Sequence, residues 1–135
     1  MHIIVCLDDR NGILFNGRRL SSDREVCKRI VELAAGKVLR MCAYSAMLFP
    51  QEKLHIDDDF LQKAEQEDIC FVENADILSC WERIHTVTVF RWNRAYPSDV
   101  KFPMHNLDTW QRETIGEFQG SSHEKITELR YTRCV

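Results

Sequence analysis

Ile3-Ile4-Val5-Cys6-Leu7 carries apolar side chains on both of its alternating faces, which is typical of a strand in the middle of a sheet that helices cover on each side. The same pattern recurs at residues 38–43, where Arg40 interrupts it, and at residues 69–72 and 87–90. Helical or turn-forming segments separate these runs. The chain therefore predicts an open α/β sheet whose central strands are mostly parallel.

The clearest helix is expected to start at Ser22. Ser22 and Glu25 form a capping-box pattern, apolar residues then recur with the helical period, and Gly36 follows as a stop signal. Shorter helices are expected at residues 45–49, 58–66 and 75–81.

The C-terminal third has a different pattern. Residues 110–118 and 124–134 read as two long strands separated by Gln119-Gly120-Ser121-Ser122, so we expect an antiparallel hairpin at one edge of the sheet. The predicted architecture has three layers, and residues 1–135 are expected to form a single domain.

The composition and charge of the chain argue against several classes of protein. With 135 residues, 44% hydrophobic and 29% charged, the chain has ordinary globular proportions that argue against disorder. The formal charge of −3 predicts no general attraction to nucleic acid. No apolar run approaches the ~18 residues that cross a bilayer, and no basic segment precedes the first strand, so we expect a cytoplasmic protein without a membrane partner.

Metal binding is not expected. The six cysteines are scattered singly, with no Cys-x-x-Cys pair, and are predicted to be mostly buried free thiols in a reducing cytosol. Asp57-Asp58-Asp59 precedes an apolar pair and more simply predicts a helix cap.

Three short motifs follow the first strand: Asn11-Gly12-Ile13, Leu20-Ser21-Ser22-Asp23 and Ser98-Asp99-Val100-Lys101-Phe102-Pro103. Their order, with a closing hairpin at residues 117–133, resembles dihydrofolate reductase. The second motif looks like that family's Leu-Pro-x-Asp/Glu element, whose carboxylate starts the first helix and binds the pterin ring. The resemblance implies a dihydrofolate-reductase-like fold, with Asp23 at the acidic position.

The sequence departs from that family where NADPH would bind. The family's second strand runs into Gly-Arg-x-Thr, whereas Cys42-Ala43-Tyr44-Ser45 stands here, and only Ser45 matches the threonine. No glycine occurs between Val72 and Val87, where the family has a glycine turn and a helix that hold the pyrophosphate. That strand, turn and helix look deleted, so we expect no NADPH and no other cofactor.

Four residues are candidates for a site: Asp23 as a catalytic acid, and Arg18, Arg19 and Ser45 as ligand-binding residues. Asp23 has an alternative role, because an acidic residue in the first turn of a helix stabilises that helix. Arg18 and Arg19 lie in a glycine-flanked loop at the strand ends, where open α/β sheets usually bind ligands.

Other catalytic classes have little support in the sequence. His123 and Lys125 would alternate with Glu124 across a strand, so the three could not share one site. No Gly-x-Ser-x-Gly elbow or recognisable triad context occurs. The chain is also similar to short bacterial chains that sometimes carry a ribonuclease Z label, but it lacks the zinc-binding His-x-His-x-Asp-His motif of that enzyme.

The leading hypothesis is a non-reductase that either binds a small molecule beside Asp23 or acts as a protein-interaction module, for example as a homodimer through an edge strand. A small-molecule-binding protein would keep an open polar pocket beside Asp23. An interaction module would fill that pocket with its own side chains. The alternatives are a reductase with atypical use of NADPH, flavin or pterin and, more remotely, a nuclease.

Overall fold

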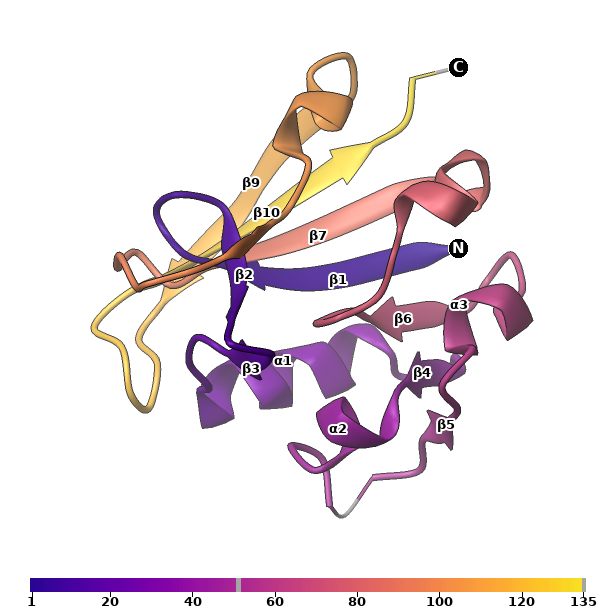
Figure 1. The fold of residues 1–135 in the computed structure, drawn as a ribbon, viewed down its shortest axis with the longest axis horizontal. Helices are drawn as coiled ribbons and strands as arrows, with labels where there is room; N and C mark the ends of the chain where they lie inside the picture. Colours follow the sequence, from indigo (N-terminus) through magenta and orange to yellow (C-terminus); the bar gives the residue numbers. More distant parts are fainter. Residues whose placement is uncertain (51, 135) are drawn as a thin grey trace.

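The structure is a computed structural model that describes residues 1–50 and 52–134. Within these residues, seven strands form one twisted sheet (Figure 1). From one edge to the other their order is β5 (His55–Ile56), β4 (Leu39–Met41), β6 (Ile69–Phe71), β1 (His2–Leu7), β7 (Thr86–Arg91), β10 (Ile126–Thr132) and β9 (Gln111–Phe118). Neighbours from β5 to β7 pair in parallel, and β10 runs antiparallel to both β7 and β9. The predicted mostly parallel sheet with an antiparallel C-terminal hairpin is confirmed.

Strand β1 lies between β6 and β7 and is buried on both faces. Ile3, Val5 and Leu7 belong to one hydrophobic cluster, whereas Ile4 belongs to a second cluster on the opposite face. This alternation is what the apolar run predicted, because successive side chains of a strand point to opposite sides. The sheet is therefore the middle of three layers.

Helix α1 (Arg24–Leu33) packs on the second cluster through Val26 and Ile30. Its N-cap is Asp23, whose side chain accepts a hydrogen bond from Glu25 N, so the prediction of Ser22 as the capping residue is wrong by one position. The other helical segments are short: α2 (Ala43–Ala46), α3 (Phe60–Lys63), and the 3₁₀ segments η1 (Leu78–Arg83) and η2 (Met104–Leu107).

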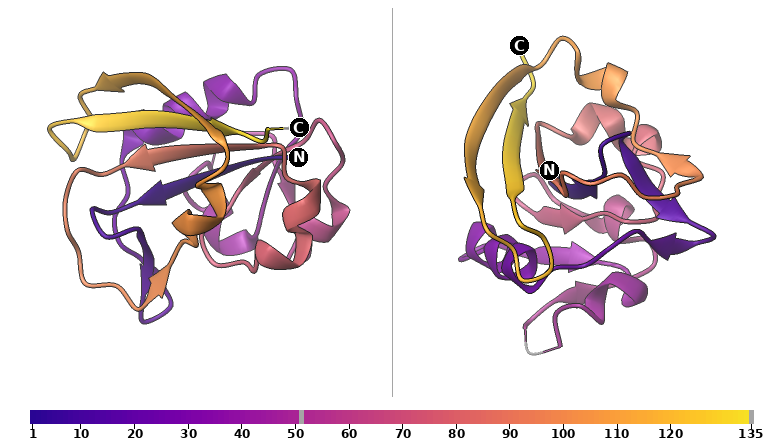
Figure 2. Two further views of the ribbon diagram at one scale, coloured as in Figure 1. Left: turned by 90° about the horizontal axis from the view of Figure 1, so that it is seen from above. Right: turned by 90° about the vertical axis from the view of Figure 1, so that its left-hand side faces the viewer.

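A second, three-stranded sheet of β3 (Arg18–Arg19), β2 (Gly12–Phe15) and β8 (Val100–Lys101) lies beside the carboxyl ends of the parallel strands. A two-residue turn joins β2 to β3, with Asn16 at φ 52° and Gly17 at φ 73°. Both values are positive, as a tight hairpin turn requires. Figure 2 shows this small sheet standing apart from the β9–β10 hairpin.

The cysteines and the helix lengths bear on two expectations from the sequence. All six cysteines are free; Cys42, Cys70 and Cys80 are buried, and Cys134 is exposed. Among the described residues, no helix has the length and apolar character needed to cross a bilayer.

Candidate functional site

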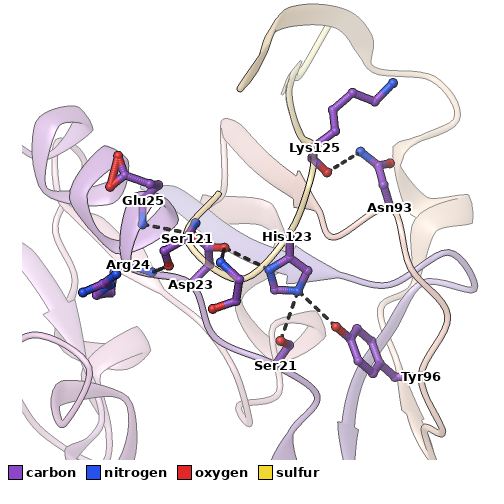
Figure 3. A network of polar contacts seen from close by, with 10 residues as sticks. Ser21, Asp23, Arg24, Glu25, Asn93, Tyr96, Ser121, His123 and Lys125 are labelled. Atoms are coloured by element: carbon purple, nitrogen blue, oxygen red, sulfur yellow. Dashed lines mark hydrogen bonds and ion pairs between the residues drawn. The ribbon is translucent and has the colours of Figure 1, made fainter. Parts of the chain in front are cut away.

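The carboxylate of Asp23, which is 3% exposed, is the centre of a polar network between α1 and the loop that joins β9 to β10 (Figure 3). Its Oδ1 accepts hydrogen bonds from Glu25 N and Ser121 N, each at 2.9 Å. Its Oδ2 accepts from Ser122 N at 2.8 Å and from His123 Nδ1 at 2.9 Å. Each oxygen thus has two protein donors.

The imidazole of His123 links this carboxylate to two hydroxyl groups. His123 lies in the loop before β10 and is 5% exposed. Its Nε2 is 3.1 Å from Ser21 Oγ and 3.0 Å from the hydroxyl oxygen of Tyr96. The Trp92 ring stacks on the imidazole at a centroid separation of 4.5 Å, which fixes the plane of the ring.

Protonation in this network follows from the charge of Asp23. Burial alone would raise the pKa of Asp23, but the hydrogen bonds from His123 and from the N–H groups of Ser121, Ser122 and Glu25 outweigh it and lower that pKa well below its usual value. Asp23 is therefore an anion, and His123 Nδ1 must carry the proton that it donates. In the neutral imidazole with this tautomer, the single lone pair of Nε2 faces the hydroxyls of both Ser21 and Tyr96 and can accept from one of them at a time.

Tyr96 is held in place by Asp8, the buried residue that follows β1. Asp8 accepts hydrogen bonds from Tyr96 N at 3.0 Å and from Gly12 N at 2.7 Å, so it ties the Tyr96 loop to β2. The Tyr96 side chain lines an open groove of about 520 Å³. The other lining residues are Phe15, Asn16, Arg18, Arg19, Leu20 and Pro97.

A polar cluster of Arg19, Tyr44, Ser45 and Glu73 joins β3 to the segment after β6. Arg19 makes a two-pronged ion pair with the buried Glu73, with Nε to Oε2 at 2.9 Å and Nη2 to Oε1 at 3.0 Å. Ser45 donates to Glu73 Oε1 at 2.8 Å, and the Arg19 guanidinium lies 4.1 Å from the ring centroid of Tyr44. These contacts connect β3 with α2 and with the segment after β6.

A more apolar groove of about 360 Å³ lies beyond that cluster, between the small sheet and residues 72–78. Ile13, Ile77, Leu78, Val100 and Phe102 are among its lining residues. Within residues 1–50 and 52–134, no three His, Cys, Asp or Glu side chains gather as they would around a metal ion.

Comparison with known proteins identifies the architecture. No protein-family model and no curated protein matches the chain in sequence. A solved structure of dihydrofolate reductase from Enterococcus faecalis, complexed with NADP(H) and RAB-propyl, matches 98% of this chain and 96% of its own with a TM-score of 0.64. The chain has a dihydrofolate-reductase-like fold. The sequence identity is 9%, so the likeness concerns the fold alone.

The dihydrofolate-reductase-like fold separates the four predicted site residues into three environments. Asp23 caps α1 and contacts His123, Arg18 is exposed in the groove, and Arg19 and Ser45 both contact Glu73. The role of Asp23 as a catalytic acid stays a prediction, whereas its alternative role at the helix start is confirmed. The deletion after residue 72 stays a prediction, and the helix expected at residues 75–81 corresponds to the 3₁₀ segment η1.

Sequence reasoning missed His123, Tyr96 and Glu73. His123 was placed in a strand with alternating sides, but β10 begins only at Ile126, so that argument does not apply. The cluster Gln119-Gly120-Ser121-Ser122 was a usable signal, since a turn-forming loop can extend beyond its strongest residues. Nothing local indicates that Glu73 meets Arg19, because the two are far apart in the chain.

Proposed function

We propose that this chain is a non-reductase that binds a small anionic molecule in the groove beside Arg18. The observation that carries the non-reductase part of the proposal is the charge and hydrogen bonding of Asp23. A carboxyl that donates a proton to a pterin must keep that proton near neutral pH. Asp23 is an anion whose two oxygens are already hydrogen-bonded to Glu25, Ser121, Ser122 and His123.

The charges in the polar cluster around Glu73 support the non-reductase part of the proposal. Glu73 lies two residues after the end of β6, in the region where the sequence resemblance implies a glycine turn for a diphosphate. Its carboxylate and the Arg19 guanidinium neutralise each other in an ion pair. A diphosphate entering there would have to break this ion pair and face Glu73, which is unfavourable in a partly buried site.

The groove beside Arg18 is open and has suitable chemistry for a small anion. Arg18 is exposed, and no ion pair involves it among the described residues. Phe15, Leu20 and Pro97 supply apolar surface next to this charge. A ligand that combines an anionic group with an apolar body would satisfy both parts.

Fluorescence titration with 8-anilinonaphthalene-1-sulfonate tests the groove, because the probe has a sulfonate and an aromatic body. Arg18→Ala should weaken binding by about two- to fivefold, the effect of losing one exposed ion pair. Arg112→Ala removes an exposed arginine from β9 and should leave the dissociation constant unchanged. Equal affinities of the two variants would contradict the proposed groove.

Thermal unfolding with NADPH tests the non-reductase part. A specific ligand at a hundredfold excess over its dissociation constant stabilises the native state by about 2.7 kcal/mol. Millimolar NADPH should leave the melting temperature of this chain unchanged. Clear stabilisation by NADPH would argue for the reductase alternative.

Protein interaction is a second candidate, favoured by apolar exposure at the other groove. Leu78 and Val100 are 52% and 45% exposed and line the same hollow. A second copy of the chain is one partner that could cover it. Sedimentation velocity over a concentration series, with Leu78→Glu as the comparison, would detect such self-association.

A further inference from the structure

Ser21, His123 and Asp23 stand in the order of nucleophile, base and carboxylate. Ser21 Oγ lies 3.1 Å from His123 Nε2, and His123 Nδ1 lies 2.9 Å from Asp23 Oδ2. Both distances fall within hydrogen-bond reach, about 2.6–3.2 Å, which a nucleophile and its general base require. Figure 3 shows the imidazole between the serine hydroxyl and the carboxylate.

We propose that Ser21 is a catalytic nucleophile, activated by His123 and oriented through Asp23, that hydrolyses a small ester carrying an anionic group. The inference rests on the proposed function for its substrate groove, and it names the class of ligand that the groove takes. Such catalytic sets are recognised by geometry and roles rather than by position in the sequence.

The network exceeds what a helix cap needs. Capping of α1 is achieved by Asp23 and the N–H of Glu25. His123 adds a buried base whose Nε2 contacts the hydroxyl of Ser21, which is partly exposed, as well as that of Tyr96. Ser121 N, Ser122 N and the Trp92 ring hold the carboxylate and the imidazole in fixed positions. This support is the kind that keeps a catalytic base aligned.

The proton positions match the required chemistry. The Asp23 anion keeps the proton on Nδ1, so Nε2 can take the proton of Ser21 as Oγ attacks the ester carbonyl carbon. The tetrahedral intermediate collapses, the carbon–oxygen bond to the alcohol breaks, and Nε2 returns the proton to the departing oxygen. Water repeats these steps on the acyl-Ser21 ester. Ester and water thus give acid and alcohol, and Ser21 is restored.

The groove supplies the substrate position. Ser21 directly follows Leu20, and it shares His123 Nε2 with Tyr96; both Leu20 and Tyr96 line the groove. Ser21 itself does not line the groove, but its hydroxyl is next to these two lining residues, and the proposal places the ester carbonyl between the groove and Ser21 Oγ. When Ser21 gives its proton to Nε2, the Tyr96 hydroxyl is released to donate to the carbonyl oxygen, where negative charge develops. Arg18 would pair with the anionic group of the ester.

Covalent labelling with an alkyl fluorophosphonate tests the nucleophile. Attack by Ser21 Oγ breaks the phosphorus–fluorine bond, releases fluoride and adds one phosphonyl group, which intact-mass measurement and peptide mapping locate. The native chain should be labelled at Ser21, and Ser21→Ala should not be labelled. Ser22→Ala changes an exposed neighbouring serine and should be labelled at the wild-type rate.

Turnover of p-nitrophenyl acetate gives a second readout that does not depend on the anion groove, because this ester carries no charge for Arg18 to bind. Ser21→Ala should remove the catalysed release of p-nitrophenolate, and Tyr96→Phe should lower kcat by about 10²-fold while circular dichroism stays unchanged. Labelling that is absent, or equally strong in Ser21→Ala or in the unfolded chain, would overturn the inference.

The two proposals fail separately. If Ser21 is not labelled while Arg18→Ala still weakens binding of the anilinonaphthalene sulfonate, the nucleophile is wrong and the anion groove remains. If Ser21 is labelled and Arg18→Ala has no effect on that binding, the nucleophile is supported and the anion groove is wrong.

Discussion

Asp23 connects parts of the chain that are almost a hundred residues apart. It starts α1 and, at the same time, receives the backbone N–H groups of Ser121 and Ser122 and the ring of His123. A buried carboxylate is costly unless it is hydrogen-bonded, and here four donors compensate for the lost solvation. The residue therefore acts in local helix capping and in long-range docking.

Asp23→Asn should make stability less sensitive to acid. Because the folded pKa of Asp23 lies below the unfolded value of about 3.9, its contribution is fully present above that pH and is lost as the pH falls further. At neutral pH, the amide of this variant would leave a buried donor unpaired and cost about 1–3 kcal/mol. Urea unfolding at several pH values should show that the difference in free energy of unfolding between wild type and Asp23→Asn narrows below about pH 4.

Asp9→Asn is the matched control, because Asp9 is exposed. It should follow the wild-type curve at every pH. A gap between wild type and Asp23→Asn that stays constant from neutral to strongly acidic pH would contradict the charge of Asp23 in the folded state.

Residue roles were predictable from the sequence only where they are local. The sequence indicated a helix start near Asp23, because caps depend on neighbours within one turn. It could not indicate the Asp23–His123 or Arg19–Glu73 contacts, since each pair meets only after the sheet has formed. A single sequence carries no signal for such pairs.

At the level of elements, the β9–β10 loop is fitted closely against the start of α1. A Cβ atom added at Gly120 would lie 2.2 Å from Asp23 Oδ2, closer than any real contact of this kind. No such obstacle exists at Gly116, where nothing lies within 4 Å of the added atom. Gly120 thus allows the loop to approach the carboxylate.

Gly120→Ala should lower the free energy of unfolding by about 1–3 kcal/mol, because either the loop or Asp23 must move. Gly116→Ala should be neutral or stabilising by up to about 1 kcal/mol, since it only restricts the unfolded chain. Urea denaturation of the two variants measures the difference. Similar stabilities would mean that the loop docks loosely.

Elements that are either long or buried throughout were the predictable ones. Strands β1, β6, β7, β9 and β10 were found because their apolar runs or their length give a strong pattern. The small sheet was missed because β2, β3 and β8 have only two to four residues and, unlike the short strand β6, are not buried throughout. The Asn16-Gly17 pair, a common hairpin turn, was the available signal.

For the whole molecule, stability should be highest at the centre of the large sheet. Ile3, Ile4 and Val5 of β1 are 0% exposed and lie between two parallel neighbours. Strand β5, at one edge, has two residues that are both exposed. The packing of both faces on β1 therefore predicts a gradient of local stability from the middle of the sheet toward β5.

Native-state hydrogen exchange should detect this gradient. The amides of Ile4 and Val5 should exchange only through global unfolding, whereas those of His55 and Ile56 should exchange through local opening with a much smaller free energy. Adding low concentrations of denaturant should accelerate exchange in β1 and barely affect β5. Equal protection of the two strands would contradict the gradient.

The central place of β1 also has a consequence for biosynthesis. His2 pairs with Ile69 on one side and with Thr86 on the other, so β1 cannot pair with either neighbour until at least half of these 135 residues have been made. During this delay its five apolar residues stay available to other nascent chains and to chaperones. Such non-local pairing predicts slow folding for a protein of this size.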